Sequence, residues 1–259
     1  MATAVNSKPV LRALLVGLAA AAPLVAADVE WGYEGKIGPE HWGELDPSFA
    51  QCSEGHEQSP VNLSRSTPSD LPDIEFDYAP IVTESVHNNG HTVEVKVEPG
   101  SSITVAGKSY ELVQFHWHAP SEHSVEQGAR YDMELHLVHR SGAGELAVVG
   151  VFIRRGRHHR ALRPIWDVLP RSADEEHVIE VELSDSDLLP ADRRYFRYPG
   201  SLTTPPCTEG VAWHVLAQPI EMSAAQVNRF LRVLDRSCCL QNARPTQPLG
   251  GRQLLRDRT

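Results

Sequence analysis

The chain has 259 residues, enough for one large domain or two small ones, and no internal repeat or low-complexity linker divides it. Its formal charge of −10 at pH 7 argues against nucleic acid as a partner, because the phosphate backbone attracts basic proteins. Beyond the N-terminal segment, no stretch is long and apolar enough to span a membrane. Many short alternating runs, with Pro and Gly scattered between them, favour a single β-rich domain.

The first 27 residues have the pattern of a secretory signal peptide. Lys8 and Arg12 give a basic start, an apolar stretch covers Leu11–Val25, and Val25–Ala27 supply small residues at a cleavage site before Asp28. An uncleaved membrane anchor is the alternative, but the apolar stretch is short for a span. We therefore expect a mature domain of residues 28–259 that is exported, to the periplasm or as a secreted protein, without a stable membrane span. Loss of two basic residues with the leader would change the net charge to −12.

The segment after the leader is rich in Trp, Gly and Pro, and predicts irregular structure. We expect Trp31, Tyr33 and Trp42 to pack this segment, residues 31–60, on the core. Strand candidates follow, because apolar or aromatic residues alternate with polar ones. The predicted strands are His91–Val97, Ser102–Ala106, Glu111–His118, Met133–His139, Leu146–Ile153, Val178–Val181 and Val211–Glu221.

Helix signals are few. Ala161–Leu169 could form a helix that ends at Pro170. Ser223 and Gln226 have the spacing of a capping box ahead of an apolar stripe, which predicts a second helix. The pattern as a whole indicates a β-dominated sheet with short helices at its periphery.

Three histidines carry the strongest chemical signal. His116 and His118 lie in one predicted strand and His136 lies in another. Residues i and i+2 of a strand point to the same face, so His116 and His118 project together, and pairing of the two strands would bring His136 to them. Three protein ligands leave the fourth position of a tetrahedral zinc open, which is typical of a catalytic site. The spacing therefore predicts an enzyme that makes a nucleophile from water.

The same alternation predicts what supports these histidines. Gln114 precedes His116 by two residues and Glu134 precedes His136 by two, so each pair shares a face of its strand. Metal-bound histidines usually donate their second ring N–H to an amide, carboxylate or carbonyl. A single strand histidine is more often an ordinary core or surface residue, and the chain has 13 histidines. The paired supporting residues favour the metal site, and we assign no ligand role to the other histidines.

The cysteines predict one disulfide. Export permits disulfides, and we expect the isolated residues Cys52 and Cys207 to pair. Cys238 and Cys239 are adjacent, and adjacent cysteines bridge only with strain. They could be buried thiols, which is the interpretation that we prefer, or they could link two chains into a homodimer.

From Trp31 to about Arg252 the chain resembles the α-class carbonic anhydrases, in particular the exported bacterial type. The motifs that carry the resemblance are short, but their order and spacing are specific: WGY (31–33), GPEHWG (38–43), QSPVN (58–62), NNGHTVEV (88–95), QFHWHAPSEH (114–123), ELHLVH (134–139), YPGSLTTPP (198–206) and NARPTQPL (242–249). Together with the alternation, the resemblance implies a mostly β fold (α+β by content). We expect a single domain with a large, mainly antiparallel, twisted central sheet and short peripheral helices.

The resemblance also implies a cofactor and a reaction. The three histidines would hold one zinc ion per chain, and zinc-bound hydroxide would hydrate carbon dioxide reversibly to bicarbonate and a proton. Thr203 would donate a hydrogen bond to Glu122 and accept one from the hydroxide, which orients the nucleophile. His91 matches the histidine that relays the product proton, because an imidazole titrates near neutral pH.

Further site residues follow from the same resemblance. Tyr33 and Asn89 match residues that order the water chain, and Asn242 would stand behind a zinc ligand. Glu94 is a departure from the family, where Gln or Asn is common, and we hypothesise that it raises the pKa of the relay histidine or alters inhibitor binding. The residues expected to contact the substrate, several of which core packing would explain equally well, are Val138, Val148, Leu202, Thr204, Val211 and Trp213.

Two other functions use the same residues. The first is a non-catalytic carbonic-anhydrase-like binding module, although such relatives typically lack a zinc histidine and all three are present here. The second is a zinc hydrolase that acts on esters, which the short turn after His139 leaves open. Both remain alternatives to an enzyme acting on a small-molecule substrate, carbon dioxide or bicarbonate.

Overall fold

The structure is a computed structural model, and it describes residues 29–258. The predicted signal peptide lies outside the described residues. The helices are α1 Trp42–Leu45, α2 Gln51–Glu54, α3 Arg163–Asp167, α4 Asp185–Leu188 and α5 Ala224–Ser237, with 3₁₀ turns at Gly35–Ile37, Pro47–Phe49, Leu63–Arg65 and Glu126–Gly128. The strands are β1 Thr67–Ser69, β2 Glu75–Tyr78, β3 Ile81–Asn88, β4 Val93–Val97, β5 Ser101–Val105, β6 Lys108–His118, β7 Met133–Arg140, β8 Leu146–Arg155, β9 Glu176–Val178, β10 Glu182–Leu183, β11 Tyr195–Ser201, β12 Glu209–Met222 and β13 Leu255–Asp257. None of the helices in this part of the chain is long and apolar enough to cross a membrane.

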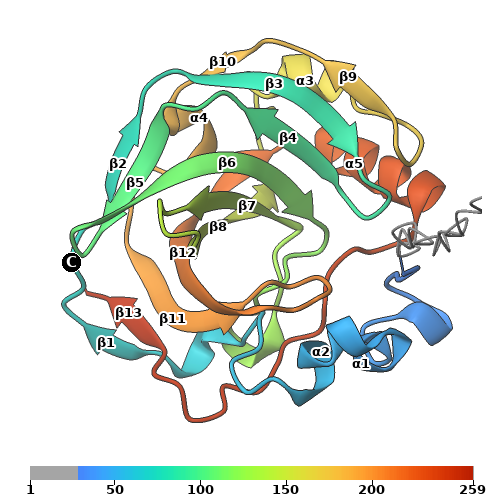
Figure 1. The fold of residues 1–259 in the computed structure, drawn as a ribbon. Coiled ribbons are helices and arrows are strands. Elements are labelled where there is room, and N and C mark those ends of the chain that lie inside the picture. The colour runs from blue at the N-terminus through green and yellow to red at the C-terminus, as the bar shows by residue number, and fades with distance from the viewer. Residues whose placement is uncertain (1–28, 259) are drawn as a thin grey trace, which may run out of the picture.

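One twisted sheet of thirteen strands organises the molecule (Figure 1). Its main path runs β1-β13-β11-β12-β8-β7-β6-β4-β3-β10, while β5 pairs with β6, β2 with β5, and β9 with β3. The pairs β1–β13 and β8–β12 are parallel, and the other pairs between these strands are antiparallel. The expected mostly β fold with a mainly antiparallel sheet and peripheral helices is therefore confirmed. Strands β6, β7 and β8 lie at its centre.

The predicted strands near the centre of the sheet agree with the structure to within a few residues. Those at the edge do not, because short edge strands bury few residues and leave little alternation to read. The predicted strand Val178–Val181 is wrong, since β9 ends at Val178 and β10 begins only at Glu182. Strand β3 was not predicted, and a register shift between Thr83 and Ser85 interrupts its alternation. Strand β11 was not predicted either, because its Pro-Gly pair has the composition of a turn.

Two hydrophobic clusters lie on opposite faces of the sheet. On one face, the larger cluster includes Trp117, Leu135 and Leu137, all fully buried, together with the apolar side of α5. On the other face, the smaller cluster includes Val138 and Trp213. Successive residues of β7 thus alternate between the two clusters, as strand geometry requires. The residues that carry the candidate site lie on the side of the smaller cluster.

The longest helix begins where its capping box predicts. The Ser223 Oγ accepts a hydrogen bond from the Gln226 backbone N–H at 3.3 Å, and the Gln226 Oε1 accepts one from the Ser223 N–H at 3.1 Å. This reciprocal pair satisfies two donors at the start of α5. The predicted helix over Ala161–Leu169 is present only as the single turn α3, which has a proline at its start.

The structure confirms one cysteine pairing and corrects another. A disulfide joins Cys52, on α2, to Cys207, as expected. Our preferred interpretation of Cys238 and Cys239 as buried thiols is wrong: the structure joins them by a disulfide, and the Cys238 side chain is exposed. The pair directly follows α5. The backbone N–H groups of Cys238 and Cys239 both donate to the Leu234 carbonyl oxygen near the end of this helix. These two bonds at the helix end hold the backbones of both cysteines, a local geometry that their spacing in the sequence does not indicate.

Two buried histidines on the face of the sheet opposite the site predict a loss of stability in acid. His139 and His214 are at most 1% exposed, and burial lowers the pKa of each from 6.5 to about 3. Both rings are therefore neutral in the folded protein, whereas the unfolded chain takes up protons below pH 6.5. The free energy of unfolding is therefore highest above pH 6.5 and decreases as the pH falls towards 3. By about pH 5 each histidine should have lowered it by about 2 kcal/mol.

Urea unfolding measured between neutral pH and pH 5 tests this expectation. In a His214→Gln variant, the free energy of unfolding should fall less steeply with pH than in the unchanged protein. An equal slope in the two proteins would show that His214 does not titrate in this way.

Candidate metal centre

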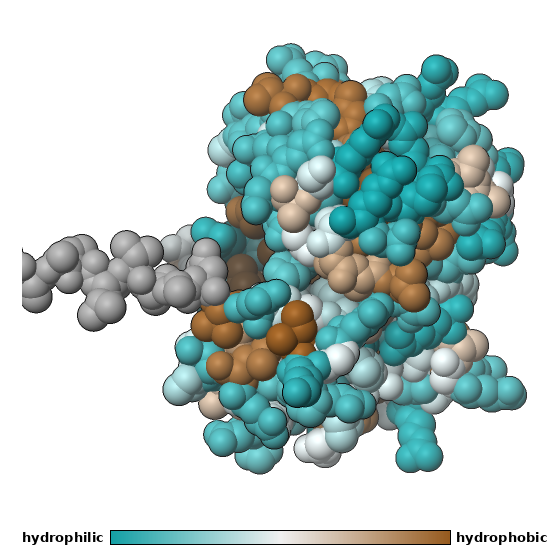
Figure 2. Space-filling view, turned by 90° about the vertical axis from the view of Figure 1, so that its right-hand side faces the viewer, coloured by the Kyte–Doolittle hydropathy of each residue, from teal (hydrophilic) through white to brown (hydrophobic). Residues whose placement is uncertain are grey.

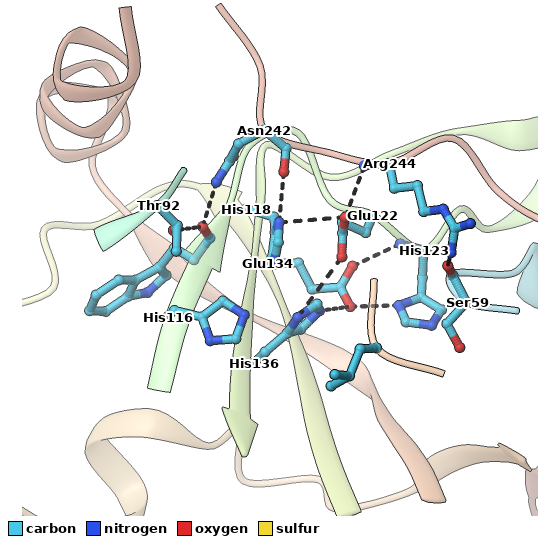
Figure 3. A network of polar contacts seen from close by, with 12 residues as sticks. Ser59, Thr92, His116, His118, Glu122, His123, Glu134, His136, Asn242 and Arg244 are labelled. Carbon is cyan, nitrogen blue, oxygen red and sulfur yellow. Dashed lines mark hydrogen bonds and ion pairs between the residues drawn. The ribbon is translucent and has the colours of Figure 1, made fainter. Parts of the chain in front are cut away.

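Three histidines meet at the centre of the sheet (Figure 3). His116 and His118 lie two residues apart on β6, and His116 pairs directly with His136 on the neighbouring strand β7. One nitrogen from each ring lies within 4.8 Å of the other two. The rings of His118 and His136 are buried, while that of His116 is partly exposed. The strand pairing assumed from the sequence therefore brings the three side chains together.

Hydrogen bonds fix which nitrogen of each ring is free. The Nδ1 of His116 lies 2.8 Å from Gln114 Oε1, and the Nε2 of His136 lies 2.9 Å from Glu134 Oε1. Both hydrogen bonds expected from strand alternation are thus present. The Nδ1 of His118 lies 2.7 Å from the backbone oxygen of Asn242. Each histidine therefore uses one nitrogen as a donor and keeps the other, Nε2 of His116 and His118 and Nδ1 of His136, as an acceptor.

This arrangement fits a metal ion. The Nε2 of His118 is buried and has no hydrogen-bond partner among the described residues, which is costly unless something binds it. Burial lowers the pKa of both His116 and His118, and nearby histidines lower that of His116 further. Neutral imidazole is the form that binds metals. Three convergent imidazole nitrogens are a ligand set that suits zinc.

A carboxylate network holds His136 from behind. Glu134 is fully buried, and its Oε1 also lies 2.7 Å from His123 Nδ1. Burial alone would raise the pKa of Glu134, but the charge and hydrogen bond of His123 and the bond from His136 lower it well below its ordinary value. The network continues from His123 Nε2 to the Tyr198 hydroxyl at 2.6 Å, and that hydroxyl donates to Ser59 Oγ. Glu134 is therefore ionised and can accept from both rings.

Sequence reasoning missed His123 as part of this support. It lies outside any strand, so alternation says nothing about it. Its position in the motif QFHWHAPSEH was the only available signal.

Glu122 lies beside the triad. It is fully buried, and its Oε1 accepts a hydrogen bond of 2.9 Å from the Arg244 backbone N–H. In the part of the chain that the structure describes, its Oε2 has no hydrogen-bond partner, and it lies 4.0 Å from His136 Nδ1 (Figure 3). Thr203 is buried as well, but the hydrogen bond expected from Thr203 to Glu122 is not formed among the described residues. The oxygen that would accept it is free.

Arg244 is a buried cation that sequence reasoning overlooked. It is 1% exposed, and burial lowers its pKa to about 10 although the charge of Glu122 favours its ionised form. Its guanidinium donates to the Gln58 side chain and to backbone oxygens of Ser59 and Cys52 at 2.7–2.8 Å. It thus joins the C-terminal segment to the disulfide-bonded segment, and its own backbone fixes Glu122.

Asn242 connects several parts of the site. Besides accepting from His118 through its backbone oxygen, its side-chain amide donates to the backbone oxygens of His91 and Trp117 at 3.1 and 3.0 Å. Its Oδ1 accepts from the Ala119 N–H at 2.8 Å. One fully buried residue therefore holds both the ligand strand and the turn that carries His91.

His91 lies on a turn before β4 and stacks on the indole of Trp31, with ring centroids 3.6 Å apart and planes at 10°. Burial lowers the pKa of His91 below its ordinary value, and the charge of Asp174 offsets only part of that effect. The Asn89 Oδ1 accepts from the backbone N–H groups of His91 and Thr92, so Asn89 shapes this turn. The Tyr33 hydroxyl is buried and has no hydrogen-bond partner within residues 29–258, and burial raises its pKa well above the ordinary value.

The apolar residues expected to contact the substrate lie in one region, and Thr204, which is polar and partly exposed, follows directly after Thr203. The smaller core cluster contains four of them as buried members and Leu202 packed against it; the four are Val138, Val148, Val211 and Trp213. Glu94 pairs with His116 across β4 and β6, and burial raises its pKa. Its predicted effect on proton transfer and inhibitors stays a prediction.

A second cluster of possible metal ligands shares a residue with the first. His123, Glu134 and His136 also place ligand atoms within 4.8 Å of one another. Their hydrogen bonds to each other already use Glu134 Oε1 and one nitrogen from each ring. This cluster is satisfied internally, whereas the first cluster leaves its convergent nitrogens free. The first is therefore the better metal site.

Comparison with known proteins agrees with this geometry. The sequence profile of the eukaryotic-type carbonic anhydrase family matches residues 37–258. A carbonic anhydrase of Nostoc sp. is 46% identical over 239 residues, which cover 90% of this chain and 88% of that protein. The α-carbonic anhydrase of Thermovibrio ammonificans, solved in complex with sulfanilamide, superposes with a TM-score of 0.83 at 39% identity and covers 88% of this chain and 100% of its own.

The same fold also occurs in a dioscorin that was solved in complex with ascorbate, with a TM-score of 0.81 and 33% identity over 88% of this chain and 97% of that one. Fold alone therefore does not identify a reaction. The family profile spans most of the chain, and named carbonic anhydrases are 36–46% identical to it over most of its length. The chain therefore belongs to the eukaryotic-type, or alpha, carbonic anhydrase family.

Proposed function

We propose that the chain is a zinc enzyme that catalyses the reversible hydration of carbon dioxide to bicarbonate and a proton. The observation that carries this proposal is the meeting of three imidazole nitrogens, two on buried rings, each opposite a hydrogen bond that fixes its ring. A bound zinc ion lowers the pKa of water enough to supply hydroxide near neutral pH. The chain's own residues would then hold the metal, orient the reactants and move the proton.

Gln114, Glu134 and the Asn242 backbone would hold the ligand rings in place. Each accepts a hydrogen bond from the nitrogen that does not face the site. Such bonds fix the tautomer and make the free nitrogen a better donor to a metal. Because Glu134 is ionised and buried, its contribution to the basicity of His136 should be the largest of the three.

Glu122 and Thr203 would orient the nucleophile. An ionised carboxylate only accepts hydrogen bonds, and Glu122 Oε2 is free to accept one. If Thr203 gives its single hydroxyl hydrogen to Glu122, its oxygen can only accept from what lies in the site. This direction selects a nucleophile or inhibitor that has a proton to donate. The apolar side chains of the smaller cluster, together with Thr204, would receive carbon dioxide, which is small and apolar.

His91 would relay the product proton between the site and solvent, with Tyr33 and Asn89 shaping the path. The proposal predicts that His91→Ala keeps its zinc content and lowers turnover chiefly in weak buffer, because an imidazole at this position would no longer carry the proton. Stopped-flow hydration assays with and without added imidazole measure this effect. Added imidazole should restore much of the rate. The matched control is His177→Ala, which changes a histidine on β9 whose side chain pairs with Glu175. A variant that keeps the full rate without imidazole would exclude the relay role.

We also propose that residues 1–27 are a signal peptide and that the protein works in the periplasm or outside the cell. The Cys52–Cys207 disulfide supports this, because disulfides persist in oxidising compartments. N-terminal sequencing of the protein recovered from a periplasmic fraction should begin at Asp28. A chain that retains its first residues and stays in the cytosolic fraction would contradict the proposal.

Metal removal tests the proposed reaction. Protein treated with a chelator should lose carbon dioxide hydration, and addition of one equivalent of zinc should restore it. A sulfonamide should inhibit the restored activity. A fully folded protein that binds zinc but does not hydrate carbon dioxide would support the non-catalytic alternative, and activity confined to esters would support the hydrolase.

A further inference from the structure

Positive charge is gathered on one side of this acidic protein. Residues 154–171 and helix α5 together carry nine arginines against two aspartates, a formal charge of +7, in a chain whose net charge is −10. These segments are in contact, because the His159 backbone N–H donates to Gln226 on α5 at 2.9 Å and Arg229 donates to the Asp167 backbone oxygen at 3.0 Å. Figure 2 views the side of the molecule on which α5 lies, and hydrophilic side chains crowd its upper half.

Five of the nine arginines form ion pairs with three acidic residues. Glu221 pairs with two of them, Asp132 with one and Asp167 with two; the five arginines are Arg154, Arg155, Arg157, Arg163 and Arg229. Such pairs need no further partner. Within residues 29–258, the other four make no ion pair with an acid; they are Arg160, Arg171, Arg232 and Arg236.

Three of these four arginines surround one hollow. It has a volume of about 290 Å³ and is lined by Leu169, Arg171, Arg229, Arg232, Val233 and Arg236, which we call the arginine hollow. Among the residues that the structure describes, no carboxylate lines it. The buried residues Leu169 and Val233 also line it, and its arginines come from α5 and from the segment after α3. Spacing of three and four residues places Arg229, Arg232 and Arg236 on adjoining rows of the helix.

Uncompensated like charges at one place favour a ligand of opposite charge. The guanidinium group is planar, always ionised, and presents paired N–H donors that match the oxygens of phosphate. A carboxylate offers two oxygens, whereas a phosphoryl group offers three and a larger charge, so it can meet several arginines at once. We propose that the arginine hollow is a binding site for phosphate-bearing anions, separate from the metal centre.

Isothermal titration of the purified protein with inorganic pyrophosphate at low ionic strength tests the site. Pyrophosphate should bind to the unchanged protein. The double variant R232E/R236E should bind it at least about tenfold more weakly, because loss of one hydrogen bond to a charged group lowers affinity about tenfold. The matched control R65E/R256E makes the same change in net charge at two exposed arginines away from α5, and it should bind like the unchanged protein. Carbon dioxide hydration by R232E/R236E should be unchanged, which shows that the variant is folded.

A vesicle arm distinguishes the source of the phosphate. Co-sedimentation with phosphatidylglycerol vesicles, but not with phosphatidylcholine vesicles, would identify a lipid headgroup as the ligand. Binding of pyrophosphate alone would identify a soluble anion. Either result supports the site if R232E/R236E loses that binding. Equal losses in R232E/R236E and R65E/R256E would overturn the proposal, because net charge would then explain the binding. So would the absence of binding to both probes. Self-association that only R232E/R236E abolishes, without probe binding, would overturn it in favour of a second copy of this chain.

Discussion

His118→Ala should lose its zinc and nearly all of its carbon dioxide hydration. Within residues 29–258 the buried His118 Nε2 has no hydrogen-bond partner, and alanine would remove it as one of three convergent ligands. Loss of a residue that merely supports a ligand costs about 10- to 100-fold in metal affinity or activity. Loss of the ligand itself should exceed about a hundredfold. Zinc content by mass spectrometry and initial hydration rates measure both effects.

The matched control is His177→Ala, which removes a half-buried histidine of β9 whose side chain pairs with Glu175. It should keep one zinc ion per chain and the full rate. If His118→Ala retained zinc and activity while its circular dichroism was unchanged, the proposed ligand set would be wrong.

Removal of the Cys52–Cys207 disulfide should destabilise the protein by about 5 kcal/mol, because it closes a loop across 155 positions of the chain. That is a large part of the 5–15 kcal/mol by which domains are typically stable. Cys207 adopts a left-handed backbone with φ 57° four residues after Thr203, and its carbonyl oxygen accepts from the Gln58 side chain at 3.0 Å. A double Cys52→Ser, Cys207→Ser variant should therefore unfold at lower urea and should also free the segment that carries Thr203.

The Cys238–Cys239 disulfide supplies the matched control. It joins neighbours, so it closes no loop and constrains the unfolded chain little. Cys238→Ser, Cys239→Ser should change the free energy of unfolding by a small fraction of the first value. Equal effects from the two double variants would show that loop closure is not the source of the stability.

The sequence alone predicts the contacts of site residues on strands better than the contacts of those in loops. Period-two alternation places His116 with His118 and predicts the hydrogen bonds of Gln114 and Glu134, because a strand repeats its faces every two residues. The contact from the Asn242 oxygen to His118 spans 124 residues and follows no local period. Resemblance to a family suggested Asn242, but neither route indicated that its backbone makes the bond.

Arg244 and His123 show the limit of local reasoning. Both are buried and polar, and both are placed by segments outside regular strands or helices. Burial of Arg244 depends on acceptors from Cys52, Gln58 and Ser59, which lie about 190 residues earlier in the chain. No pattern of neighbours reveals such a site before the fold brings the acceptors together. Edge strands escape prediction for a related reason, since they bury too few residues to impose alternation.

The identity of the zinc-binding nitrogens tests the central claim most directly. A crystal structure of the zinc-loaded protein, with the metal located by its anomalous scattering, should place zinc on Nε2 of His116, Nε2 of His118 and Nδ1 of His136, the three nitrogens that the hydrogen bonds leave free. Each distance should be about 2.0–2.1 Å, with one open position. Zinc bound instead by His123 and Glu134, or found away from these strands, would contradict the assignment of the metal centre and the function built on it.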